Sequence, residues 1–139
     1  MYILLINNSL LFVSHILCYD IWYYIIHYLM HTRRLYFIHK LHHKHLPNLL
    51  TYKDAYAGNI IEFPLETAGI FIPCIIIETT RTIIFCSILF IFIRNLMQHD
   101  KRFIWLVGDH HLLHHKYPFC NYGEYWIDKL FGTNYYKKI

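Results

Sequence analysis

The sequence predicts an all-α protein, a multi-span membrane helical bundle with a cytosolic histidine-rich cap. Three observations support this fold class. The 139 residues are 56% hydrophobic and only 16% charged, with a mean hydropathy of +0.27, so the apolar surface exceeds what one core of this size can bury. The apolar residues form runs long enough for membrane helices, and the 12 histidines cluster at short, fixed spacings. A chain of this length is expected to form one domain over residues 1–139.

The first membrane span is expected over residues 10–29, because a bilayer crossing takes about 20 mostly apolar residues. Asp20 and His27 stand seven residues apart and therefore on one helical face, which is expected to look into the protein. His15 lies in the middle of this span, where we expect a polar side chain that is satisfied inside the protein. The N-terminal apolar run lacks a basic region and a cleavage site, so we expect it to stay attached.

A second apolar region is expected to form a helical hairpin with spans over residues 58–77 and 80–98. The ETTR cluster at 78–81 divides the two arms and forms the tip. Because the chain crosses twice, the histidines before and after the hairpin return to one face. Of the 13 Lys and Arg residues only Arg81 falls at the tip, so the positive-inside rule places the histidine face in the cytosol. The cap is expected to comprise residues 27–46 and 99–133.

Both hairpin arms contain charged residues, because their uncharged cores are too short to span alone. Glu62, Glu66 and Arg94 are therefore expected to face the protein interior or to reach toward the interface. Pro64 and Pro73 would kink or break the first arm. This leaves open a hairpin that is buried in protein or only dips into the membrane.

The cysteines and the net charge of +4 exclude other classes of protein. The cysteines stand apart, at Cys18, Cys74, Cys86 and Cys120, with no CxxC pair or disulfide framework, which fits a reducing compartment on the polar side. The Lys and Arg residues flank apolar stretches and do not alternate with stacking aromatics on one polar face. We therefore expect no nucleic-acid partner, and the composition indicates the membrane instead.

Three histidine motifs indicate the chemistry. They are, in chain order, His27-x3-His31, His39-x2-His42-His43 and His111-x2-His114-His115. Imidazoles at i, i+3 and i+4 of one helical face can grip one metal or bridge toward two. Interfacial packing would explain the first pair alone, but a solvated polar face has no need of the same H-x-x-H-H spacing twice.

These motifs and His99 provide too many ligands for one tetrahedral metal, so two metals are expected. The candidate ligands are His27, His31, His39, His42, His43, His99, His111, His114 and His115. Neutral nitrogen ligands suit a redox metal such as iron, whereas Mg²⁺ or Ca²⁺ would need clustered carboxylates. The absence of H-E-x-x-H and of a cysteine zinc signature in the sequence argues against a zinc protease or deaminase.

The pattern resembles the fatty acid hydroxylase superfamily, which includes the sterol desaturases and sterol C4-methyl oxidases. The resemblance runs from about Asp20 to Thr133. Besides the three histidine motifs it includes Asn121-Tyr122-Gly123 and the segment Asp128-Lys-Leu-Phe131-Gly132-Thr133. The forms HKLHHKH and HHLLHH look more like the sterol branch.

The resemblance implies O2-dependent hydroxylation or desaturation of a sterol or fatty acyl lipid by two histidine-bound iron ions. Zinc can replace iron at these sites in purified protein. It implies a multi-pass protein of an endoplasmic reticulum-like internal membrane and an electron donor of the cytochrome b5 or reductase type. Family members carry a further metal-binding histidine where His99 stands. The basic residues that would dock such a donor, or simply anchor the chain, are Lys101, Arg102, Lys116, Lys129, Lys137 and Lys138.

Other residues are candidates for supporting roles. Asp20, Asp109 and Asp128 would accept hydrogen bonds from metal-bound imidazoles, although Asp128 is also a candidate cap of its turn. His45 and His110 are left open as ligands or as donors beside the site.

Three alternatives to the enzyme remain. One is a shortened, inactive family member, since relatives carry further helices before the first motif and only 26 residues precede His27 here. Homo-oligomerisation would then supply the packing partners of the missing helices. Another is a non-catalytic metal-binding carrier or sensor, although a carrier would place its ligands at the bilayer midplane. The third is a structural subunit of a lipid-synthesis complex, which would not need every motif intact.

Overall fold

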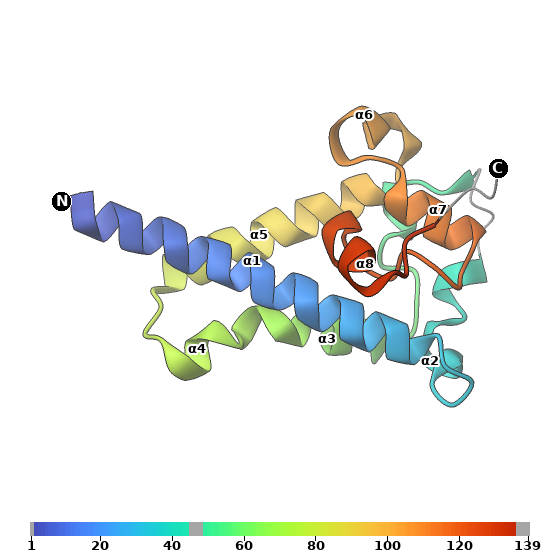
Figure 1. Cartoon of the computed structure of the whole chain (residues 1–139), viewed down its shortest axis with the longest axis horizontal. Helices are drawn as coiled ribbons and strands as arrows, with labels where there is room; N and C mark the ends of the chain where they lie inside the picture. The colour runs from blue at the N-terminus through green and yellow to red at the C-terminus, as the bar shows by residue number, and fades with distance from the viewer. Residues whose placement is uncertain (1, 45–48, 136–139) are drawn as a thin grey trace.

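The chain is all-helical over the part that the structure, a computed structural model, describes: residues 2–44 and 49–135 contain helices and turns and no strand. The predicted all-α fold is confirmed for these residues. Two long helices, α1 (Tyr2–Met30) and α5 (Arg81–Gln98), form the frame (Figure 1). At 1.5 Å per residue they measure about 44 Å and about 27 Å, against a hydrocarbon core of about 30 Å.

Both long helices are apolar enough to cross a membrane, α1 over Asn7–Met30 and α5 over its full length. They coincide with two of the three expected spans, 10–29 and 80–98. Thr80 begins α5 as its N-cap, with a side chain that accepts a hydrogen bond from the Ile83 N–H. The two helices that frame the molecule are therefore the candidate membrane spans.

The third expected span, residues 58–77, is not one continuous helix. It is divided into α3 (Glu62–Thr67), the 3₁₀ helix η4 (Ala68–Phe71) and α4 (Pro73–Ile76). Pro64 lies in the first turn of α3 and Pro73 is the first residue of α4, the helical positions where proline costs least. The prolines thus set the breaks between these pieces.

The segment α3–η4–α4 runs along α1 toward its N-terminal end, and α5 returns beside α1 (Figure 1). Tyr19, Ile70 and Ile91 pack together as a buried core between these three parts. The approach of η4 to α1 is close at Gly69, where a Cβ would lie 2.2 Å from the Cβ of Trp22. Any larger residue there would push η4 away from α1.

A partly buried polar network joins α1, the last turns of α5 and the C-terminal segment. Arg94 forms an ion pair with Asp20 on α1, and its Nε lies 3.3 Å from the Glu124 carboxylate. The Gln98 amide donates to Glu124 at 2.7 Å. A charge at this depth is retained only where it is paired, so the network sets how the C-terminal segment packs on the helices.

Short helices gather at the shared end of α1 and α5, to the right in Figure 1. They are α2 (Tyr36–His39), η1 (His42–Lys44), η3 (Tyr52–Asp54), η5 (Lys101–Phe103), α6 (Ile104–Val107), α7 (His110–Lys116) and α8 (Tyr125–Phe131). Gly132, at φ 68°, ends α8 in the left-handed conformation that glycine adopts without strain. Because the hairpin returns to this end, residues from both halves of the sequence meet there.

Candidate metal centre

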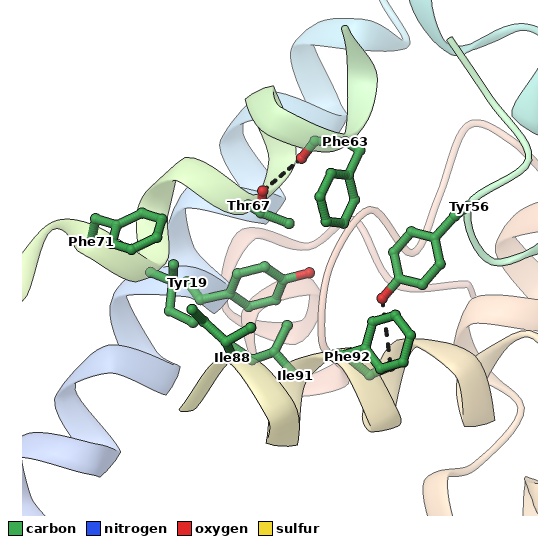
Figure 2. Close-up of a pocket in the computed structure, with 9 residues that line it drawn as sticks. Tyr19, Tyr56, Phe63, Thr67, Phe71, Ile88, Ile91 and Phe92 are labelled. Carbon is green, nitrogen blue, oxygen red and sulfur yellow. Dashed lines mark hydrogen bonds between the residues drawn. The ribbon is translucent and has the colours of Figure 1, made fainter. Parts of the chain in front are cut away.

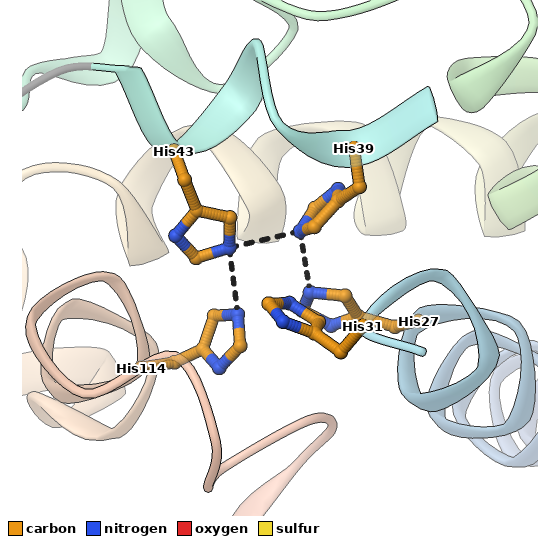
Figure 3. A group of neighbouring side chains, drawn as sticks. All are labelled: His27, His31, His39, His43 and His114. Atoms are coloured by element: carbon orange, nitrogen blue, oxygen red, sulfur yellow. Dashed lines mark hydrogen bonds between the residues drawn. The ribbon is translucent and has the colours of Figure 1, made fainter. Parts of the chain in front are cut away.

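Nine histidines meet at the shared end of α1 and α5 in two groups. The first group is His27, His31, His39, His43 and His114, shown in Figure 3; the second is His42, His99, His111 and His115. Within each group the candidate ligand atoms all lie within 4.8 Å of one another. These are the nine residues selected from the sequence as candidate ligands.

The two H-x-x-H-H motifs each supply both groups. In the motif on α7, His111 and His115 enter the second group, while His114 between them enters the first. The other motif mirrors this, since His39 and His43 enter the first group and His42 the second. Residues i and i+4 share one face of a helix, and residue i+3 lies to one side of that face. One motif can therefore provide ligands for two neighbouring metal sites.

The spacing of the motif at His39 to His43 predicted a single α-helix, but the motif does not lie on one. α2 ends at His39, and His42 and His43 begin the 3₁₀ helix η1 after a turn. His39 and His43 nevertheless converge, with their Nε2 atoms 3.0 Å apart. His39 and His43 thus meet without the α-helix that the spacing predicted, and His42 joins the other group.

Hydrogen bonds on the Nδ1 side fix the tautomer of several of these imidazoles. Nδ1 of His27 lies 2.6 Å from the Tyr122 carbonyl, and Nδ1 of His114 lies 2.7 Å from the Cys120 carbonyl. A carbonyl oxygen only accepts, so each Nδ1 carries the proton and each Nε2 keeps its lone pair. The Asn95 carbonyl holds His99 in the same way at 2.8 Å.

Nε2 atoms face one another across the first group, and those of His27 and His114 are unprotonated because their Nδ1 atoms carry the proton. Nε2 of His39 lies 2.9 Å from that of His27, and His43 Nε2 lies 3.0 Å from that of His114. Nitrogens bound at about 2.1 Å and at right angles around one metal are about 3.0 Å apart, whereas a tetrahedral pair is about 3.4 Å apart. Two lone pairs at this separation repel unless a proton or a metal cation lies between them, and the spacing suits nitrogen ligands of one metal.

The second group has the same geometry. Nε2 of His99 lies 3.0 Å from Nε2 of His42 and 3.0 Å from Nε2 of His111, and His115 follows at 3.2 Å from His111. All four residues are buried. Four imidazoles aimed at one point provide the nitrogen ligands of a second metal.

His31 supplies an independent sign that the first group is a metal site. Both of its ring nitrogens are buried without a hydrogen-bond partner, although the ring lies within 5 Å of those of His39, His43 and His114. A buried imidazole with no partner on either nitrogen is costly. Binding a cation through one nitrogen would remove half of that cost.

Burial keeps these imidazoles neutral, which is the form that binds metal. It lowers the pKa of His31 to about 3, with repulsion from His43 adding to the effect, and that of His43 to about 4. The pKa of His99 is lowered to about 4, again mainly by burial. Burial likewise lowers the pKa of His39, His111, His114 and His115. At neutral pH no proton has to leave these nitrogens before a metal binds.

Asp128 fixes the loop that holds His27. Its carboxylate accepts hydrogen bonds from the backbone N–H of Tyr122 and of Gly123, each at 2.8 Å, and from the Thr133 hydroxyl. The Tyr122 carbonyl in turn accepts from His27. Asp128 therefore acts on the metal centre only through the loop. It accepts from no imidazole of either group, whereas its bonds to the backbone N–H groups and to Thr133 correspond to the expected role of a turn cap.

The structure gives different roles to the other polar candidates. His110 binds the Asp128 carboxylate at 3.0 Å and belongs to neither group. Asp20 pairs with Arg94 and is not the acceptor for His27, and Asp109 only precedes α7 as its N-cap residue without a side-chain cap bond. His15, fully buried, bonds the Ile70 carbonyl through Nδ1 at 2.6 Å, but its Nε2 is buried without a hydrogen-bond partner, so only one of its two ring nitrogens is satisfied as expected. His45 lies outside the described residues.

Glu62 is a part of the centre that the sequence reading missed. Its carboxylate accepts a hydrogen bond from Nδ1 of His39 at 2.7 Å and is buried. The signal was available, because an acidic residue in an apolar stretch is expected to have a partner inside the protein. The carbonyls of Tyr122, Cys120 and Asn95 carry no such signal, since every residue has one.

The fold and the site together define a membrane-associated helical protein with two histidine groups able to bind metal. A model of the fatty acid hydroxylase family matches residues 12–133, which include all nine histidines. The chain therefore belongs to the fatty acid hydroxylase family, as its motifs indicated. Comparison with curated proteins and with solved structures gives no further match.

Proposed function

We propose that this protein is a membrane-bound di-iron oxygenase that hydroxylates or desaturates a sterol or fatty acyl lipid with O2. The observation that carries the proposal is the convergence of histidine Nε2 atoms in two adjacent groups, at separations that suit two metals. Five and four imidazoles from the two groups would hold one iron each. Zinc, which accepts the same ligands, would compete during purification.

Bound iron would activate O2 so that it oxidises an unactivated C–H bond. Hydroxylation then consumes the substrate, O2, two electrons and two protons, and gives an alcohol and water. The residues of the chain hold the nitrogen ligands: Glu62 and the Tyr122 carbonyl keep the Nδ1 protons of His39 and His27 in place, so both Nε2 atoms stay unprotonated. The electrons would come from a partner, for which we propose a cytochrome b5-type protein or a reductase.

An apolar cavity between α1, α3 and α5 supports a lipid substrate (Figure 2). Its volume is about 190 Å³, and it is lined by Tyr19, Tyr56, Phe63, Thr67, Ile70, Phe71, Ile88, Ile91 and Phe92. It lies beside the two helices able to cross a membrane. A lipid chain could therefore enter from the bilayer without crossing water.

A small polar hollow adjoins this cavity and reaches the second histidine group. Tyr56 and Phe63 line both spaces, and the hollow also contains His42, Glu62 and Glu66. An apolar cavity that leads to polar groups beside a metal ligand would orient a lipid with its polar end toward that ligand. This supports an amphiphilic lipid over a plain hydrocarbon.

We also propose that the histidine end faces the cytosol in a multi-pass protein of an endoplasmic reticulum-like membrane. The support is the Lys and Arg distribution, because only Arg81 lies at the hairpin tip. The nine histidines lie at the opposite end, beside the C-termini of α1 and α5.

The activity is tested by lipid profiling of cells that express the protein with an electron donor. Oxidised lipid should appear with the wild type and vanish with His43→Ala and His114→Ala, which remove ligands of the first group. Insertion into the membrane should persist in both. His15→Ala, which removes an imidazole outside both groups, should leave the metal content unchanged. If the wild type yields no oxidised lipid, the non-catalytic metal-binding protein becomes the better account.

A further inference from the structure

The helix α6 exposes an apolar surface that nothing in the described part of the chain covers. Trp105 is 81% exposed, Leu106 56% and Ile104 41%. The helix is only four residues long and ends at Gly108, whose φ of 75° turns the chain back toward α7. A tryptophan and two aliphatic residues on one short projecting helix are costly to leave in water.

The position of α6 identifies what covers this surface. It begins within a few residues of the end of α5 and projects sideways from that end (Figure 1). A groove of about 460 Å³ lies at this end of α5, lined by Ile93, Leu96 and Met97 together with Tyr52, Arg102 and Phe103, the residue that directly precedes α6. The exposed apolar residues of α6 therefore follow, within a few residues, the C-terminal end of a helix that is apolar enough to cross a membrane.

Positive charges stand directly before this apolar surface. Lys101 and Arg102 are exposed and form η5, immediately ahead of α6. Asp100 accepts from Arg102 Nε at 2.9 Å, and the guanidinium carbon lies 5.7 Å from the ring centre of Tyr52. The cation is thus held at the rim of the groove. Basic residues at the headgroups, with an aromatic residue just below, are the pattern of a segment lying in the membrane interface.

We propose that residues 101–107 form an interfacial anchor that inserts Trp105 between the lipids of an anionic phospholipid surface. Lys101 and Arg102 would lie among the phosphates, and the apolar side of α6 would lie at the boundary of headgroups and acyl chains. Since α7 starts two residues after Gly108, the anchor would hold His111 and His115 at a fixed depth above the bilayer. The proposal concerns the membrane surface and is independent of any oxygenase activity.

The test places the full chain in lipid nanodiscs and follows Trp105 fluorescence. The contribution of Trp105 is the difference between the wild type and Trp105→Phe, because Trp22 and Trp126 also emit. Nanodiscs of phosphatidylcholine brominated near the glycerol end of the acyl chains should quench most of this contribution. Bromines near the methyl end should quench little of it, and aqueous iodide should have little access.

Charge dependence is the second arm of the test. Adding phosphatidylserine to the nanodiscs should increase the shallow quenching, and Lys101→Gln should reduce this increase, whereas Lys53→Gln, an exposed lysine outside the anchor, should not. Quenching by iodide without quenching by brominated lipid would overturn the proposal. Protection from both quenchers would also overturn it, because a protein contact, such as a second copy of the chain, would then cover α6.

Discussion

Glu62 controls His39 from the side of the ring that faces away from the other imidazoles. By accepting the Nδ1 proton at 2.7 Å, it fixes the orientation of the ring and leaves Nε2 to face His27 and His43. Without this acceptor the ring could turn, and either nitrogen could carry the proton. Its effect on metal binding is therefore indirect but specific to one ligand.

We predict that Glu62→Ala lowers metal affinity by about 10- to 100-fold, the range found when such an outer partner is lost. Glu62→Gln should cost less, because its amide oxygen can still accept from Nδ1. Metal retention during titration with a chelator measures both. Glu78→Gln, an exposed change of the same type at the hairpin tip, is the control. Equal retention in wild type and Glu62→Ala would show that His39 is held by other contacts.

At this scale the spacing along the chain predicted nine candidate ligands, but not how they divide into two groups. His111 and His115 are one helical turn apart and share a face. His114 lies to the side of that face, which places it in the other group. The orienting groups were only partly predictable. Asp128 and Glu62 are side chains with a chemical signature, whereas the Tyr122 and Cys120 carbonyls are brought to His27 and His114 by folding alone.

The elements that enclose the apolar cavity connect the membrane to the metal centre. α5 contributes Ile88, 41% exposed, and the buried Ile91 to the cavity lining, whereas Leu89, 45% exposed, does not line the cavity. The alternation follows from the helical period, since adjacent residues lie about 100° apart around the axis. One helix therefore offers both a cavity wall and a lipid-facing surface.

We predict that Ile88→Trp lowers lipid oxidation by filling the cavity while leaving the metal content unchanged. The larger ring occupies space that the lipid chain would need, and Ile88 contacts neither histidine group. Turnover and metal content, measured together, separate the two effects. Leu89→Trp is the matched control, with the same change on the lipid-facing side of α5. Similar turnover in the two variants would mean that the substrate reaches the metals by another route.

Sequence patterns were reliable for the long elements and weaker for the broken one. The spans 10–29 and 80–98 are mostly apolar and appear as parts of α1 and α5. The arm at 58–77 carries Pro64 and Pro73, which announce breaks but not how the pieces pack. Its close approach to α1 depends on Gly69 facing Trp22, a tertiary contact that no local pattern encodes.

At the scale of the whole molecule, the hairpin brings two distant parts of the chain to one end. His39 and His99 are 60 positions apart, yet both belong to the paired groups beside the C-termini of α1 and α5. The partly buried Asp20, Arg94 and Glu124 network holds this end together. The metal centre thus depends on the topology of the chain as much as on its motifs.

We predict that the hairpin tip and the C-terminus lie on opposite sides of the membrane. An epitope inserted at Thr79 should be protected when the plasma membrane alone is permeabilised, and one after Ile139 should be accessible, because the chain crosses between them once through α5. An epitope at Lys53 should behave like the one at Ile139. Equal accessibility of the Thr79 and Ile139 epitopes would contradict the crossing by α5.

Metal stoichiometry tests the central claim, that two histidine groups form two metal sites, most directly. Elemental analysis of the purified protein should give about two equivalents of iron and zinc combined per chain, since the nine nitrogens suffice for about four to five ligands on each metal. His111→Ala, in the second group, and His31→Ala, in the first, should each reduce the total by up to one equivalent. A value near one in the wild type, or a value that neither variant lowers, would contradict the two-site account.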